Sequence, residues 1–151
     1  LFGKNIKIPR LQCWYADEGC NYKYSGKMLE RNNWHPTLLE IKSSIEFITS
    51  QKYNSVLANY YRDGSDSMGW HSDDESMLDK DSAIASVSLG QERPLHFKHK
   101  NQDISFAIDQ SHGSVIVMDG DTQKYWKHCI KKSKKLMKPR LNLTFRTIIT
   151  A

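Results

Sequence analysis

The sequence is poor in the residues that mark specialised protein classes. Its 151 residues include three cysteines, four prolines and eight glycines, with no internal repeat and no low-complexity segment. The cysteines form an odd set without zinc-ligand spacing, which argues against both a disulfide framework and a zinc site. The longest uncharged apolar run, Ser82 to Gly90, is too short to span a membrane. These absences predict one globular domain, residues 1–151, with no membrane contact.

Acidic residues are missing from both ends of the chain. Residues 1–16 contain three basic residues, residues 122–151 contain nine, and all seventeen acids lie between Asp17 and Asp121. Basic ends of this kind suit a polyanion such as nucleic acid, although a solvated basic surface explains a lysine run equally well. The compact domain favours a monomer in a bacterial cytoplasm, with a nucleus as the alternative for a eukaryotic source.

Hydrophobic periodicity predicts one helix and then a series of strands. Between Pro36 and Gln51, apolar residues recur near the helical period, and proline suits a first helical turn. Later segments are rich in β-branched and aromatic residues and are separated by turn-forming residues. The expected strands are Tyr53–Tyr61, Ala83–Leu89, Pro94–Lys100, Ile104–Ile108, Ser114–Met118, Tyr125–Ile130 and Arg140–Ile149. One or two N-terminal helices followed by about seven strands predict a mainly β (α+β) fold with a jelly-roll core.

A histidine and an aspartate two residues apart form the first candidate for chemistry. In an extended segment, His71 and Asp73 point to the same side because strand side chains alternate. One further nitrogen ligand would complete a 2-His-1-carboxylate triad, which suits non-haem Fe(II) and leaves positions open for a co-substrate and O2. Five other histidines compete for this place, and His128 is favoured because it lies on a late strand before the arginine-rich one.

The last predicted strand carries an unusual polar face. One face holds Leu141, Leu143 and Phe145, and the other holds two guanidinium groups that flank an amide and a hydroxyl. Such a face can bind a small dicarboxylate through charge-assisted hydrogen bonds. A solvated outer face is the ordinary alternative. Asn59 and Tyr61 repeat the same-side polar pattern on an earlier strand.

Together these motifs resemble the AlkB family of Fe(II)- and 2-oxoglutarate-dependent nucleic-acid dealkylating dioxygenases. The resemblance extends from Phe2 to Ile148 and depends on four motifs in the order of that family. They are Asn59-Tyr60-Tyr61, His71-Ser72-Asp73, His128, and Arg140-Leu141-Asn142-Leu143-Thr144-Phe145-Arg146. The arginine motif at its distance from the third ligand is the most specific of the four.

The resemblance implies a double-stranded β-helix (a jelly roll) over residues 53–149, with a nucleotide-recognition lid or hairpin in residues 1–30. It assigns the metal to His71, Asp73 and His128, which are also the catalytic residues. It assigns 2-oxoglutarate to Asn59, Tyr61, Arg140, Asn142, Thr144 and Arg146. Which arginine holds which carboxylate stays open. The implied cofactor is Fe(II), with 2-oxoglutarate and O2 as co-substrates.

The resemblance also implies contacts with nucleic acid. Tyr22 and Tyr24 resemble lid aromatics that hold a flipped base, with ordinary packing as the alternative. Asp74 and Glu75 are placed to meet the cationic ring of an N-methylated base, with a solvated acidic turn as the alternative. Phe2, Gly3 and Lys4 resemble a hairpin whose apolar residue fills the gap left by that base. Lys134 and Lys135 lie where related proteins have a basic loop that binds the opposite strand of the duplex.

The implied function is repair of alkylated DNA by oxidative demethylation of N-methylated bases (1-methyladenine and 3-methylcytosine type), with release of formaldehyde. The same chemistry on RNA or protein is one alternative. A nucleic-acid-binding relative without turnover is another, although it would not need the metal triad or the two arginines.

Overall fold

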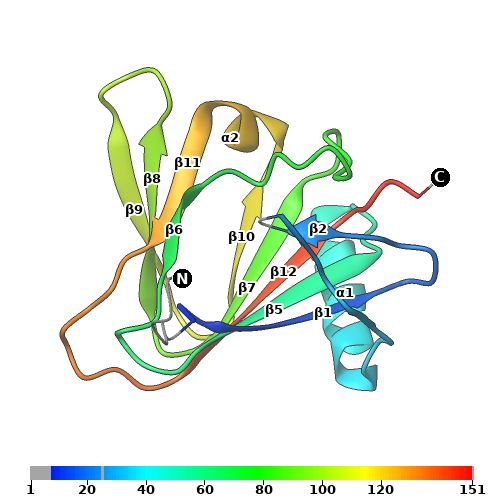
Figure 1. The fold of residues 1–151 in the computed structure, drawn as a ribbon, viewed down its shortest axis with the longest axis horizontal. Helices are drawn as coiled ribbons and strands as arrows, with labels where there is room; N and C mark the ends of the chain where they lie inside the picture. Colours follow the sequence, from blue (N-terminus) through cyan, green and yellow to red (C-terminus); the bar gives the residue numbers. More distant parts are fainter. Residues whose placement is uncertain (1–7, 25, 151) are drawn as a thin grey trace, which may run out of the picture.

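Two facing β-sheets form the body of the computed structural model, which describes residues 8–24 and 26–150. The larger sheet has six strands, and its spatial order places the last strand of the chain near its centre (Figure 1). In that order they are β10 (Ser114–Met118), β7 (Ile84–Gly90), β12 (Arg140–Arg146), β5 (Ser55–Tyr61), β1 (Leu11–Ala16) and β4 (Arg31–Asn32).

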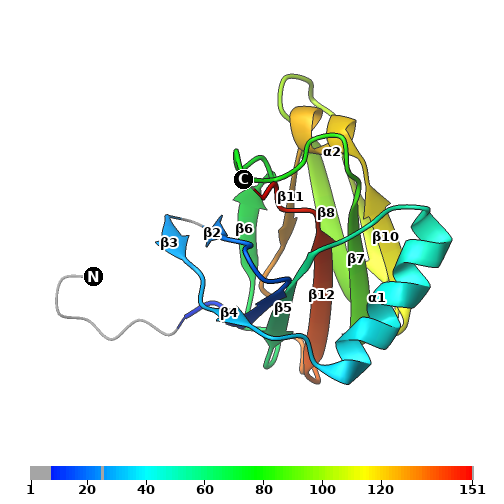
Figure 2. The same cartoon turned by 90° about the vertical axis from the view of Figure 1, so that its right-hand side faces the viewer.

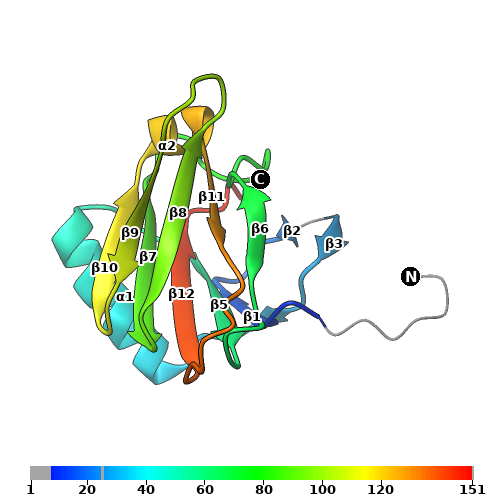
Figure 3. The ribbon, with the colours of Figure 1, turned by 90° about the vertical axis from the view of Figure 1, so that its left-hand side faces the viewer.

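The smaller sheet has four strands in the order β6 (Met68–His71), β11 (Trp126–Ile130), β8 (Arg93–His99) and β9 (Ser105–Gln110). A short hairpin, β2 (Lys23–Tyr24) with β3 (Lys27–Met28), projects beside the larger sheet (Figure 2). The helix α1 (Pro36–Thr49) covers the outer face of the larger sheet, and the smaller sheet covers its other face (Figure 3). The second helix, α2 (Gly120–Tyr125), connects β10 to β11.

The central strand β12 is buried on both faces. Its apolar residues Leu143 and Phe145 pack in a cluster with Ile45 of α1. Its polar residues therefore face the space between the two sheets, where Arg140 is 2 % and Arg146 is 4 % exposed. A strand normally wets its polar face, so the alternative of a solvated outer face is wrong for β12.

The structure confirms the mainly β class and the predicted helix, which ends two residues early at Thr49 because Ser50 adopts a left-handed conformation (φ 54°). Among the described residues one helix precedes the expected strands; the second lies late, at α2, where the sequence suggests a turn. Residues 11–16, expected in the lid segment, form β1 in the larger sheet, since Trp14 and Ala16 are buried. No helix among the described residues is long and apolar enough to cross a membrane.

Candidate active site

Three side chains from two adjacent segments form a compact group of metal-ligand type. Ligand atoms of His71, Asp73 and His128 all lie within 4.8 Å of one another. His71 and His128 are direct cross-strand partners on β6 and β11, which explains how residues 57 positions apart meet. Asp73 follows β6 immediately and remains on the same side. The structure thus brings together the three predicted metal ligands.

Neighbouring groups hold two members of this triad, His71 and Asp73, in orientation. The His71 Nδ1 atom lies 2.8 Å from the Gly69 carbonyl oxygen, so a proton on Nδ1 leaves Nε2 free to bind a metal. The backbone N–H of Asp73 donates to Oε1 of Gln123 on α2 at 2.8 Å. Arg146 donates to Asp73 Oδ2 at 2.9 Å, while Oδ1 has no hydrogen-bond partner in the described part of the chain.

The buried charges set the protonation states that a metal ion needs. Burial alone raises the pKa of the Asp73 carboxyl, but Arg146 and the two imidazoles outweigh it and lower the pKa to about 2. Burial lowers the pKa of His128 to about 4, although Asp73 opposes this shift. At neutral pH the site therefore holds an anionic carboxylate beside a neutral His128, as metal coordination requires.

All six predicted 2-oxoglutarate residues line one hollow between the two sheets, which we call the inner cavity. They share it with the metal triad and with Ser86 of β7. The predicted residues in its wall are Asn59, Tyr61, Arg140, Asn142, Thr144 and Arg146. Pairing of β12 with both β5 and β7 brings these residues to one face of the larger sheet.

Both arginines of the inner cavity retain unused hydrogen-bond donors. Arg140 donates through Nη2 to Ser88 Oγ at 2.8 Å, and its guanidinium lies 5.0 Å from the Tyr61 ring centroid. Nε and Nη1 of Arg140 and of Arg146 find no hydrogen-bond partner among the residues described. Because buried donors are nearly always paired in folded proteins, this arrangement fits an anionic ligand in the cavity. Asp73 Oδ1, which also lacks a hydrogen-bond partner among these residues and lies 3.6 Å from His71 Nε2, fits a metal in the same way.

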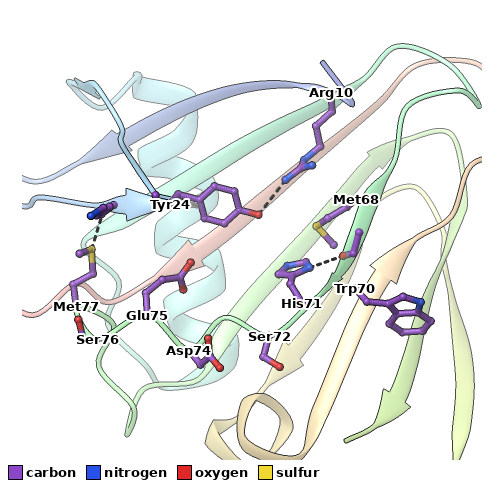
Figure 4. A pocket seen from close by; sticks show the side chains of 13 residues that line it. Arg10, Tyr24, Met68, Trp70, His71, Ser72, Asp74, Glu75, Ser76 and Met77 are labelled. Carbon is purple, nitrogen blue, oxygen red and sulfur yellow. Dashed lines mark hydrogen bonds between the residues drawn. The ribbon is translucent and has the colours of Figure 1, made fainter. Parts of the chain in front are cut away.

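A second, more open hollow adjoins the inner cavity, and we call it the mouth. Tyr24, Met68 and His71 line both hollows, so the mouth reaches the metal triad at His71 (Figure 4). Asp74 and Glu75, both predicted substrate residues, also line the mouth. Burial raises the pKa of the Glu75 carboxyl.

Three of the remaining predicted substrate residues, Tyr22, Lys134 and Lys135, do not line the mouth. Tyr22 is fully buried, with its ring 5.7 Å from that of Trp14. Lys134 and Lys135 are exposed on the loop between β11 and β12. Phe2, Gly3 and Lys4 lie outside the described residues. For all of these, contact with nucleic acid stays a prediction.

Several residues that contact the site escaped the sequence reasoning, among them Arg10, Ser86, Ser88 and Gln123. The two serines alternate along β7, a period-two pattern of small polar residues that marks one face of the strand. Arg10 and Gln123 are distant in sequence from the groups they bind, and no local pattern points to either.

The fold and the site together define a class: non-haem iron oxygenases whose metal triad lies beside a cationic pocket for an acidic co-substrate. The chain belongs to the 2OG-Fe(II) oxygenase superfamily, whose family model matches residues 3–146.

Individual relatives narrow this assignment and confirm the resemblance to the AlkB family. The human DNA oxidative demethylase ALKBH2 is 39% identical over 157 residues, covering 99% of this chain and 60% of its own. The bovine alpha-ketoglutarate-dependent dioxygenase alkB homolog 3 is 41% identical over 150 residues, covering 93% and 52%. The chain thus spans roughly half to two thirds of the length of such relatives. The solved structure of OsALKBH1 matches with a TM-score of 0.60 at 22% identity over 78% of this chain and 66% of that one, which shows the shared fold.

Proposed function

We propose that this protein is an Fe(II)/2-oxoglutarate-dependent dioxygenase that demethylates N-methylated bases in DNA. The observation that carries the proposal is a pair of adjoining hollows. The inner cavity holds a His–Asp–His triad and two arginines with unused donors, and the mouth beside it has aromatic side chains in its wall. The names of the similar proteins, a DNA oxidative demethylase and an alpha-ketoglutarate-dependent dioxygenase, support the same reading.

In this proposal His71, Asp73 and His128 hold the iron. Bound Fe(II), with O2 and 2-oxoglutarate, supplies the oxidation that converts an N-methyl group to a hydroxymethyl group, which is then lost as formaldehyde. Arg146 keeps the Asp73 carboxylate anionic and oriented, with Oδ2 occupied and Oδ1 available. Gln123 fixes the backbone of Asp73, which lies beyond the end of β6, and so helps to position the carboxylate.

The two arginines lie at different places in the inner cavity, and their positions suggest how 2-oxoglutarate is oriented there. Arg146 contacts Asp73 and so belongs to the metal end of the inner cavity. Arg140 is six residues away on the same face of β12, beside Tyr61 and Ser88. We therefore assign the keto-acid end of 2-oxoglutarate to Arg146 and its distal carboxylate to Arg140, with Asn59, Asn142 and Thr144 along the wall.

The mouth receives the methylated base in this proposal. The ring of Tyr24 provides an aromatic surface next to His71, and Asp74 and Glu75 face a cationic base electrostatically. Lys134 and Lys135 would bind phosphates, and Phe2, with Gly3 and Lys4, would support a duplex. Every group comes from one chain, so the proposal requires no partner subunit.

The structure offers a reason to prefer an enzyme over a binding module without turnover. Two nearly fully buried guanidinium groups with unpaired nitrogens cost stability, and a module that only binds nucleic acid gains nothing from them.

The proposal is tested by incubating the protein with Fe(II), ascorbate, 2-oxoglutarate and oligonucleotides that carry one N-methylated adenine or cytosine. Mass spectrometry should show the loss of one methyl group, together with formaldehyde, only when 2-oxoglutarate is present. Matched DNA and RNA oligonucleotides separate the two substrates. Absence of methyl loss from every nucleic acid, while succinate still forms in the presence of another substrate class, would contradict the proposal.

A further inference from the structure

Arg10, just before β1, is a buried arginine that belongs to neither the metal triad nor the predicted co-substrate residues. It is 8 % exposed, and its guanidinium contacts three separate segments. Nε donates to Asn59 Oδ1 on β5 at 2.8 Å, and Nη1 donates to the Ser67 carbonyl oxygen, next to β6, at 3.3 Å. Nη2 donates to the Tyr24 hydroxyl on the β2–β3 hairpin at 3.1 Å (Figure 4).

These contacts span the boundary between the two hollows. Asn59 lines the inner cavity, Arg10 lines the mouth, and Tyr24 lines both. One rigid, planar guanidinium therefore connects a wall residue of the co-substrate pocket to an aromatic residue of the substrate pocket.

The contact with Asn59 also sets the orientation of its amide. Asn59 Oδ1 accepts from Arg10 Nε and from Gln12 Nε2 at 2.9 Å, so both donors fix the oxygen on the side of β1. The amide nitrogen makes no hydrogen bond within the described part of the chain and is left for the inner cavity. An amide nitrogen donates hydrogen bonds, as a carboxylate ligand requires.

We propose that Arg10 is a positioning residue that couples co-substrate binding in the inner cavity to substrate binding at the mouth. A base held against Tyr24 restrains the Tyr24 hydroxyl, which restrains Arg10 and in turn keeps the Asn59 amide nitrogen directed at 2-oxoglutarate. Thermodynamic linkage makes the effect reciprocal: bound 2-oxoglutarate orders Tyr24 and tightens binding of the oligonucleotide by the same factor. This inference rests on the proposed function and deepens it.

Three substitutions distinguish coupling between the two hollows from a purely structural role of Arg10. Tyr24→Phe removes only the hydroxyl and keeps the ring at the mouth. Arg10→Gln removes the guanidinium that joins the two hollows. Gln12→Leu removes the other donor to Asn59 but does not reach Tyr24, so it is the matched control, and Gln12 is exposed, which favours normal folding.

The measurement is the affinity for 2-oxoglutarate by calorimetry on the full chain, with Mn(II) in place of iron, with and without a methylated single-stranded oligonucleotide. In the wild type the oligonucleotide should tighten 2-oxoglutarate binding by about fivefold or more. Tyr24→Phe and Arg10→Gln should both reduce that factor to nearly one. Gln12→Leu should weaken 2-oxoglutarate binding a few fold and leave the factor unchanged.

The opposing results are equally distinct. A factor near one in the wild type, or a wild-type factor retained in Tyr24→Phe, would overturn the coupling and leave Arg10 as a structural brace. If Arg10→Gln fails to fold, Tyr24→Phe still decides the matter, since it changes no buried charge. A wild type that demethylates but shows no coupling overturns this inference alone. A wild type that binds neither ligand overturns the proposed function, and the inference with it.

Discussion

The inner cavity and the mouth adjoin each other, yet they are built from different kinds of structure. The wall of the inner cavity that faces the smaller sheet takes its polar groups from the long strands β5, β7 and β12, and β12 pairs with both of the others. The mouth takes Tyr24 from a hairpin of two-residue strands and Asp74 and Glu75 from a loop. Groups on paired strands hold their geometry, whereas groups on short elements adapt. The polar wall of the inner cavity is thus held rigidly, whereas the side chains that line the mouth can adjust their positions.

Changes in the inner cavity should therefore act on chemistry and stability, whereas changes in the nucleic-acid contacts outside it should act on binding.

The largest effect is expected at the metal triad. His128→Ala removes one of three ligands and should lower turnover on the order of a thousandfold or more. The measurement is formaldehyde release, with circular dichroism to confirm the fold and metal analysis to confirm loss of iron. Asp73→Ala should lose activity as well, but it also leaves Arg146 as a buried unpaired cation, which costs about 3–5 kcal/mol of stability. Retained turnover in His128→Ala would show that the ligands are wrongly assigned.

The next effect is on the pH dependence of stability in the metal-free protein. Burial lowers the pKa of His128 to about 4, so the unfolded chain takes up this proton near pH 6.5 while the folded chain does not. The free energy of unfolding should therefore fall as the pH drops from 6.5 to 4, by about 3 kcal/mol in total. Asp73, with its pKa lowered to about 2, loses its contribution only below pH 4, so the two windows are separate.

Urea unfolding at pH 7 and pH 4.5 measures this difference, and His128→Gln is the control that should reduce it. The same pH dependence in both proteins would mean that another group is responsible.

A somewhat smaller effect is expected at the far end of the inner cavity. Arg140→Ala removes a guanidinium that has two unused nitrogens for a carboxylate. Loss of such a charge-assisted contact should cost about 1.5–3 kcal/mol, which raises the 2-oxoglutarate requirement by roughly 10- to 100-fold. The KM for the oligonucleotide should change little. If the oligonucleotide KM rose instead, Arg140 would belong to the nucleic-acid surface, and the distinction between the two hollows would be lost at this residue.

The sequence alone predicts those features of the site that arise within a single strand. The alternation along β12 indicates which residues share a face, and the His-x-Asp spacing indicates two ligands, since both patterns lie within one strand or its end. The sequence of β12 alone does not predict that its polar face turns inward. That burial depends on the smaller sheet, whose strands are distant in the sequence and cover this face. The strand β1 and the helix α2 were not expected, because a six-residue segment carries too little periodicity to define either.

Arg10 shows the limit most clearly. Its three hydrogen-bond partners lie 14, 49 and 57 residues away, so no spacing in the sequence points to them. From the residues next to it in the sequence, Arg10 is recognised only as one of the basic residues near one end of the chain.

The smallest effect is expected farthest from the chemistry, at Lys134 and Lys135. Ser133 donates its backbone N–H to the Gly64 carbonyl oxygen at 2.7 Å, and Arg93 donates to the Lys131 carbonyl oxygen at 2.7 Å, so the start of this loop is anchored while both lysines remain exposed. Replacing both lysines with glutamine should weaken duplex binding severalfold, for every sequence, and reduce the slope of log K against log salt by about 1.8. Fluorescence anisotropy over a salt series measures both quantities. Lys42→Gln, on α1 across the larger sheet, is the control and should leave the slope unchanged. Equal slopes for the double variant and this control would show that the lysine loop is a solvated surface, and that the basic end of the chain contacts nucleic acid elsewhere.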